Sequence, residues 1–250
     1  MTLRAYHDVV AQTLQTLVET QAAAIEDAGR LGAEAILQGG LIHAFGTGHS
    51  HVIAEEMFAR AGGLVLVNAI LDPALMLHEG IQRSSSLERM PGYAERILEL
   101  EPIATGDLLI VVSNSGRNAV PVEAAMYGQK RGMKVVAITS VAHSQSQPPN
   151  HASGKRLFEL ADVVIDNGGI PGDAALQVPG TAVMTAATST VMGAFIAQAI
   201  VAAVAERLAA AGVQPMPFLR SGNLEGAKEH NQQVRAAYLD RLAKIRAYLG

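Results

Sequence analysis

Hydroxyl and amide side chains are concentrated in two glycine-containing segments of the chain. The first reads Gly46-Thr47-Gly48-His49-Ser50-His51, and the second reads Ser113-Asn114-Ser115-Gly116-Arg117-Asn118. Pro121 lies in the first turn of the helix expected after the second segment, where backbone N–H groups have no partner within the helix. Hydroxyls and such N–H groups form a neutral binding site for a phosphate. The alternative is that these residues only cap the helix.

A third hydroxyl cluster, Thr188-Ser189-Thr190, lies at or within the start of a long uncharged helical stretch. Taken alone, these Ser and Thr side chains would only satisfy backbone carbonyls inside a packed helix.

Two common nucleotide motifs are incomplete. The first segment begins like a dinucleotide fingerprint, but His51 occupies the position of the third glycine, and Asn68 and Ala69 follow the second aliphatic run where an acidic residue is expected. The stretch Gly154-Lys155-Arg156 lacks the glycine spacing and the Ser/Thr of a P-loop. We therefore predict no NAD site and no cofactor.

Carboxylates and imidazoles follow the first segment closely. Glu55 and Glu56 are candidates for proton transfer, and His49 and His51 are expected at the same opening of the predicted site. The alternative for the carboxylates is a helix surface on which Glu56 pairs with Arg60, four residues away. His51 and Glu55 would give a metal two ligands from one helix face, but no third ligand is evident, so we predict no metal site.

A polar insertion follows the second aliphatic run. It reads Leu77-His78-Glu79-Gly80, then Arg83-Ser84-Ser85-Ser86 and Arg89. It has two interpretations: a lid or a loop that reaches a sugar from a neighbouring subunit, or a solvated surface turn.

The elements that position these residues alternate along the chain. Buried parallel strands are typically short aliphatic runs, and five are present: Leu41–Phe45, Leu64–Val67, Leu108–Val112, Val135–Thr139 and Val163–Asp166. Helices are expected at residues 2–38, 50–61, 93–100, 119–131, 154–161 and 225–249. This alternation predicts a doubly wound parallel sheet, in which ligands bind beyond the carboxyl ends of the strands.

Composition narrows the class of protein. The 250 residues are 49% hydrophobic and 17% charged, with net charge −4 and no cysteine. Disorder, disulfides, thiolate metal sites and a cysteine nucleophile are excluded, and no basic face for nucleic acid is expected. Residues 1–21 lack the apolar stretch of a signal peptide. We expect a single domain over residues 1–250, with its core at about 39–205.

The stretch Ala174–Ala205 contains no charged residue. A membrane span is one interpretation, but several Thr and Gln side chains and Pro179-Gly180 favour a helix buried in a subunit interface. We predict no membrane segment.

The three hydroxyl-bearing segments together resemble the sugar isomerase (SIS) domain family of phosphosugar-binding proteins. The resemblance covers about Gly39 to Ala205 and is carried by three segments: Phe45-Gly46-Thr47-Gly48-His49-Ser50, Val112-Ser113-Asn114-Ser115-Gly116 and Thr188-Ser189-Thr190. It implies a flavodoxin-like three-layer αβα sandwich with a five-stranded parallel sheet. It also implies sites built between paired subunits. We further expect a cytoplasmic homodimer or tetramer.

The resemblance assigns roles to particular residues. It implies that Ser113, Asn114, Ser115 and Asn118 hold a phosphate, helped by Ser50 and a hydroxyl of the Thr188–Thr190 cluster. A late helix supplies the acid or base in several such enzymes, which by analogy implicates Glu229 or His230. The chain departs from the phosphoheptose isomerases, whose first helix carries His and Glu where Glu56 and Arg60 stand here.

Three functions follow as expectations. The first is an isomerase of a sugar phosphate or amino-sugar phosphate that uses acid/base proton transfer. The second is a lyase that cleaves an ether of an amino-sugar phosphate, and the third is a non-catalytic sugar-phosphate sensor acting through a protein partner.

Overall fold

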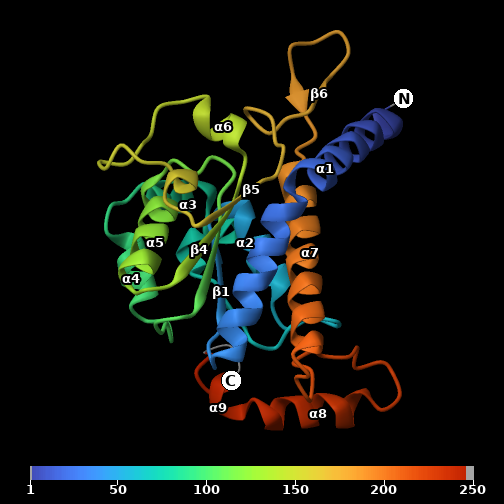
Figure 1. The fold of residues 1–250 in the computed structure, drawn as a ribbon. Helices are drawn as coiled ribbons and strands as arrows, with labels where there is room; N and C mark the ends of the chain where they lie inside the picture. The colour runs from blue at the N-terminus through green and yellow to red at the C-terminus, as the bar shows by residue number, and fades with distance from the viewer. Residues whose placement is uncertain (1, 246–250) are drawn as a thin grey trace.

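The chain forms a five-stranded sheet with helices on both faces (Figure 1). The computed structural model describes residues 2–245. The strands lie in the order β2-β1-β3-β4-β5, and every neighbouring pair is parallel. Their bounds are β1 (Ile42–Gly46), β2 (Val67–Ile70), β3 (Leu108–Val112), β4 (Lys134–Thr139) and β5 (Val163–Asp166). This confirms the predicted α/β fold.

The central strand, β3, explains the continuous aliphatic runs. All five of its residues are buried, because helices cover both of its faces. Leu108 and Ile110 pack into the core beneath α1 (Thr2–Leu37), α2 (His51–Met57) and α7 (Ser189–Ala210). Leu109 and Val111 pack into a second core beneath α4 (Tyr93–Leu98) and α5 (Ala119–Lys130). The two cores hold the carboxyl ends of β1 and β3 side by side.

Shorter elements connect or extend these layers. The α-helices among them are α3 (Ile81–Glu88), α6 (Val141–Gln145), α8 (Ala227–Ala237) and α9 (Leu239–Leu242). The 3₁₀ turns are η1 (Gly48–Ser50), η2 (Pro73–Leu75), η3 (Leu77–Glu79) and η4 (Leu157–Glu159). A small hairpin, β6 (Leu176–Gln177) with β7 (Met184–Thr185), projects beyond the N-terminus of α7 (Figure 1).

The second strand lies three residues later than predicted. Residues 64–66 are aliphatic and fully buried, but Leu64 and Val65 pair with the C-terminal segment at Phe218 and Pro217. Strand β2 therefore begins only at Val67. Burial alone does not tell which backbone partner an aliphatic run has.

Three predicted helices differ from the structure by more than two residues. The helix expected at 50–61 ends at Met57, and Ala59 has a positive φ of 47°. The one expected at 154–161 is reduced to η4, because Leu157 N–H bonds to the Gly116 carbonyl instead of continuing a helix. The C-terminal helix is divided into α8 and α9 at Tyr238, and the part predicted for 246–249 lies outside the described residues.

Helix α7 is long and apolar enough to cross a membrane, with a mean hydropathy of 1.6. Half of that apolar window is buried within the chain, chiefly against α1 and α2. A core helix of an α/β protein has the same properties.

A buried polar network joins β1 to the start of β3 at the amino ends of the strands. The His43 Nε2–H donates to Asp107 at 2.9 Å, and the His43 Nδ1 accepts from Asn68 at 3.1 Å. Asp107 also accepts from the N–H groups of Leu41 and Ala104. His43 is 0% exposed and Asp107 is 2% exposed. This network lies at the amino ends of the strands, at the opposite end of the sheet from the glycine- and serine-containing loops.

Candidate functional site

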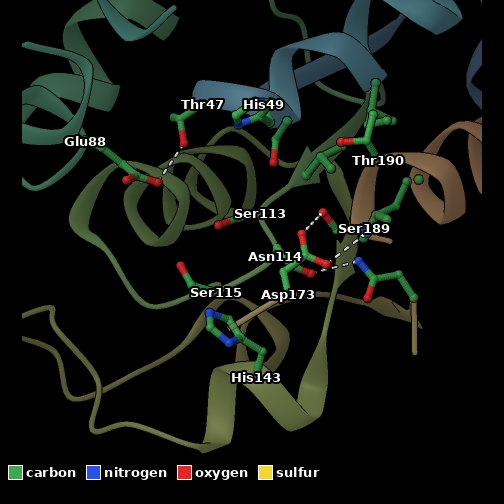
Figure 2. Close-up of a pocket in the computed structure, with 16 residues that line it drawn as sticks. Thr47, His49, Glu88, Ser113, Asn114, Ser115, His143, Asp173, Ser189 and Thr190 are labelled. Carbon is green, nitrogen blue, oxygen red and sulfur yellow. Dashed lines mark hydrogen bonds between the residues drawn. The ribbon is translucent and has the colours of Figure 1, made fainter. Parts of the chain in front are cut away.

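The strand order places a ligand site between β1 and β3. The order in which the chain adds strands reverses there, because β2 lies on one side of β1 and β3 on the other. A cavity of about 250 Å³ opens at the carboxyl ends of β1, β3 and β4 (Figure 2). Its polar lining consists of Thr47, His49, Ser50, Glu88, Ser113, Asn114, Ser115, His143, Asn167, Asp173, Ser189 and Thr190.

One wall of the cavity is the serine turn, residues 113–118, which leads into α5. Asn118 is the N-cap of α5 and has an extended backbone. Gly116 has φ +56°, and a Cβ there would approach the Thr139 Oγ1 to 3.0 Å, so glycine suits this position. The Gly116 N–H donates to the Ser113 Oγ at 3.1 Å. The turn is thus held with its hydroxyls beside the positive end of the helix.

The Asn114 side chain is oriented by its neighbour on the next loop. Asn167 Nδ2 donates to the Asn114 Oδ1 at 3.0 Å, and the Asn167 Oδ1 accepts from the Gly169 N–H. Because the Asn114 oxygen is engaged, the donor end of its amide is the one available to a ligand. The first turn of α5 carries no acidic side chain. This wall therefore presents donors to an anion.

The N-terminus of α7 is different, because a carboxylate already caps it. Asp173 accepts from the N–H groups of Thr188 and Ser189 at 3.1 and 3.0 Å, and from the Ser189 hydroxyl. The positive end of α7 is thus compensated within the chain. In contrast, no side chain caps the N-terminus of α5, which leaves its first N–H groups for an added anion.

His143, which the sequence analysis did not identify, lies beside Ser115 in the cavity (Figure 2). Its Nδ1 accepts from the Gly172 N–H at 2.8 Å. The neutral ring therefore carries its proton on Nε2, which adds a donor to the same wall.

Glu88 is the second residue that the sequence analysis missed. It ends α3, within the polar insertion, and its two oxygens accept from the Thr47 hydroxyl and the Asn118 amide. The insertion thus reaches the cavity from within the same chain. A lone glutamate after a serine-rich stretch matches no motif, so no sequence signal identifies it.

The cavity brings together most of the predicted binding residues. His49, Ser50, Ser113, Asn114, Ser115, Ser189 and Thr190 line it. Gly48, Gly116, Asn118 and Thr188 belong to the same loops but do not line the cavity, and Asn118 and Thr188 are buried behind it.

The predicted acid/base carboxylates of α2 lie outside the cavity. Glu55 is exposed, and Glu56 pairs with Arg60 and accepts from Gln198 on α7. The structure therefore shows the alternative for Glu56, an ion pair with Arg60 on the helix surface.

The ring of His51 is buried, with 2% of the residue exposed, and neither nitrogen has a hydrogen-bond partner among the described residues. Burial lowers the pKa of His51 below its ordinary value, so the ring is neutral at pH 7. Among residues 2–245, no three His, Asp or Glu side chains lie close enough to hold a metal.

Glu229 and His230 lie far from the cavity of their own chain. They are on α8, which follows the C-terminal end of α7, whereas the cavity is at the N-terminal end (Figure 1). At 1.5 Å per residue, α7 is about 33 Å long. The His230 ring bonds to the Phe218 carbonyl at 3.0 Å. Within one chain, these two side chains do not reach the cavity.

Comparison with known proteins identifies one matching family model and relatives that align along nearly the whole chain. A family model for the SIS domain matches residues 5–140. A UPF0309 protein of Halalkalibacterium halodurans is 44% identical over 90% of this chain and 93% of its own length. A UPF0309 protein of Listeria innocua is 44% identical over 95% of this chain and 96% of its own length.

Solved structures share the fold at low identity. Phosphoheptose isomerase GmhA from Neisseria gonorrhoeae has a TM-score of 0.56 and 18% identity, over 81% of this chain and 97% of that one. The Vibrio vulnificus NanR protein complexed with ManNAc-6P has a TM-score of 0.53 and 16% identity, over 96% of this chain and 69% of that one. These similarities concern the fold.

Proposed function

Because the chain belongs to the SIS domain family, we propose that its cavity binds a phosphorylated sugar, with the phosphate at the N-terminus of α5. The serine turn is the observation that carries this proposal. It combines the Ser113 and Ser115 hydroxyls, the oriented Asn114 amide and the His143 Nε2–H around a helix terminus with no acidic residue in its first turn. Each of these groups donates to phosphate oxygens in a charge-assisted hydrogen bond.

The reaction that this arrangement supports best is isomerisation of a sugar phosphate or amino-sugar phosphate. A bound phosphate fixes one end of the sugar, while titratable groups at the cavity act on the other end. One structural neighbour is a phosphoheptose isomerase and another is a NanR protein complexed with ManNAc-6P, so two outcomes must be distinguished, turnover and binding alone.

We expect isothermal calorimetry to show binding of at least one member of a panel of hexose 6-phosphates, amino-sugar 6-phosphates and heptose 7-phosphates. The matching free sugars are expected to bind far more weakly, because the phosphate supplies the charge-assisted bonds. The protein is also expected to exchange the C2 proton of the bound sugar with solvent deuterium. Binding without exchange would indicate a sensor, and absence of binding across the panel would contradict the proposal.

We further propose that the protein is a cytoplasmic homodimer or tetramer. An apolar groove between α1 and α7 supports association of copies, with Val18 at 51% and Phe195 at 40% exposure. Glu229 and His230 would then contribute to turnover from a second copy. Light scattering is expected to give at least twice the monomer mass of 26.2 kDa, and a monomer at micromolar concentration would contradict this part of the proposal.

A further inference from the structure

We infer that Glu88 is the catalytic base that carries the proton between C2 and C1 of the bound sugar. The inference rests on the proposed isomerisation and adds a residue that no motif of the sequence identifies. Among the described residues, Glu88 and Asp173 are the carboxylates that line the cavity, so a carboxylate base supplied by this chain would be one of these two.

Asp173 is already engaged within the chain. Three donors at the start of α7 bond to its two oxygens. Moving this carboxylate onto a substrate carbon would uncap a 22-residue helix. Glu88 has one donor on each oxygen, at 2.7 Å from the Thr47 Oγ1 and 3.0 Å from the Asn118 Nδ2. Since a carboxylate oxygen accepts two hydrogen bonds, each oxygen of Glu88 keeps a position for a substrate proton.

The side chain of Glu88 is held in a fixed place. Thr47 belongs to the loop of residues 46–51 after β1, and Asn118 is the N-cap residue of α5. The carboxylate therefore bridges two of the loops that form the cavity, and Figure 2 shows its bond to Thr47. The Asn118 amide is itself oriented, because its Oδ1 accepts from Asn150 at 3.1 Å. A base positioned by packed neighbours needs little rearrangement when it reacts.

No cation neutralises Glu88 among the described residues. The two arginines of this segment bond elsewhere: Arg83 pairs with Glu79, and Arg89 bonds to Ser85. No lysine or arginine within residues 2–245 lines the cavity. The Glu88 carboxylate is therefore not committed to an ion pair within the described residues and is available to a substrate proton.

The step balances without any further reactant. Glu88 takes the proton from C2 of the open-chain aldose, and the C2–H electron pair forms the C1=C2 bond while the π pair of C1=O moves to O1. O1 gains the proton that O2 loses, so that O2 becomes the carbonyl oxygen. The C1=C2 pair then takes the proton from Glu88 at C1. The products are the ketose and the original carboxylate.

The test uses Glu88→Gln with Glu79→Gln as the matched control. Both variants replace a carboxylate of the same insertion by its amide, and Glu79 is exposed and paired with Arg83. For the panel member that the wild type binds, Glu88→Gln is expected to lower C2 exchange in deuterium oxide by about 10³-fold, with Kd within threefold. Glu79→Gln is expected to retain the wild-type rate.

Glu88→Asp serves as a second variant in case the amide does not fold, as judged by circular dichroism. Shortening the side chain withdraws the carboxylate from the substrate, so exchange is expected to fall about 10²-fold while binding is retained. Exchange within threefold of wild type in either folded variant would overturn the assignment. Parallel loss of binding in Glu88→Gln would also overturn it, since Glu88 would then only hold Asn118 and Thr47.

Failure of the two proposals is distinguishable. A wild-type protein that binds no sugar phosphate contradicts the proposed function. A wild-type protein that binds but does not exchange overturns the role of Glu88 and leaves phosphosugar binding in place.

Discussion

The double substitution Ser113→Ala and Ser115→Ala is expected to weaken sugar-phosphate binding by about 10²- to 10⁴-fold. Hydrogen bonds to a charged group contribute about 1.5–3 kcal/mol each, so two lost hydroxyls cost about 3–6 kcal/mol. Removing the Ser113 Oγ also frees the Gly116 N–H that holds the turn. The measurement is the Kd from isothermal calorimetry, with the sugar phosphate that the wild type binds best.

Ser86→Ala is the control for this experiment. Ser86 is an exposed serine of α3 that does not line the cavity, and its loss is expected to leave Kd unchanged. Equal affinity of the wild type and the double variant would show that the phosphate binds elsewhere.

Asp107→Ala is expected to lower the free energy of unfolding by about 3–5 kcal/mol, because it leaves buried donors without an acceptor. These donors are the His43 ring and the N–H groups of Leu41 and Ala104. Asp8→Ala, at an exposed position of α1, is the control and is expected to change stability little. Urea unfolding at pH 7 measures both, and a loss below about 1 kcal/mol for Asp107→Ala would contradict the expectation.

The Asp107 carboxylate is also expected to make the stability of the fold depend on pH. Burial opposes ionisation of Asp107, but the hydrogen bonds from His43, Leu41 and Ala104 outweigh it and lower the pKa below its ordinary value. A group with a lowered folded-state pKa stabilises the fold above its unfolded pKa, about 3.9 for Asp. This contribution is lost as the pH falls from about 4 through the folded pKa. The Asp107→Ala variant is expected to lack that part of the acid destabilisation.

The sequence was informative where local pattern and tertiary structure agree. The run Leu108–Val112 is aliphatic at every position because both faces of β3 are covered, so its strand was predicted with the correct bounds. The serine turn was recognisable because Ser113, Asn114, Ser115 and Gly116 are adjacent in the chain. Their parallel strands then bring them next to Ser50 at one edge of the sheet.

The remaining features depend on contacts between distant segments. The aliphatic run at Leu64 predicts a strand of the sheet, but the bridge partner of Leu64 is Phe218, more than 150 residues away. Glu88 reaches the cavity through Thr47 and Asn118, which lie 41 and 30 residues from it. The orientation of the His143 ring likewise depends on its hydrogen bond from the Gly172 N–H. No local spacing encodes such pairs.

A crystal structure of the protein with a bound sugar phosphate tests the central claim most directly. We expect phosphate oxygens within hydrogen-bond distance of the Ser113 and Ser115 hydroxyls and of backbone N–H groups at the start of α5. A phosphate bound at any other place, with the serine turn unoccupied, would contradict it.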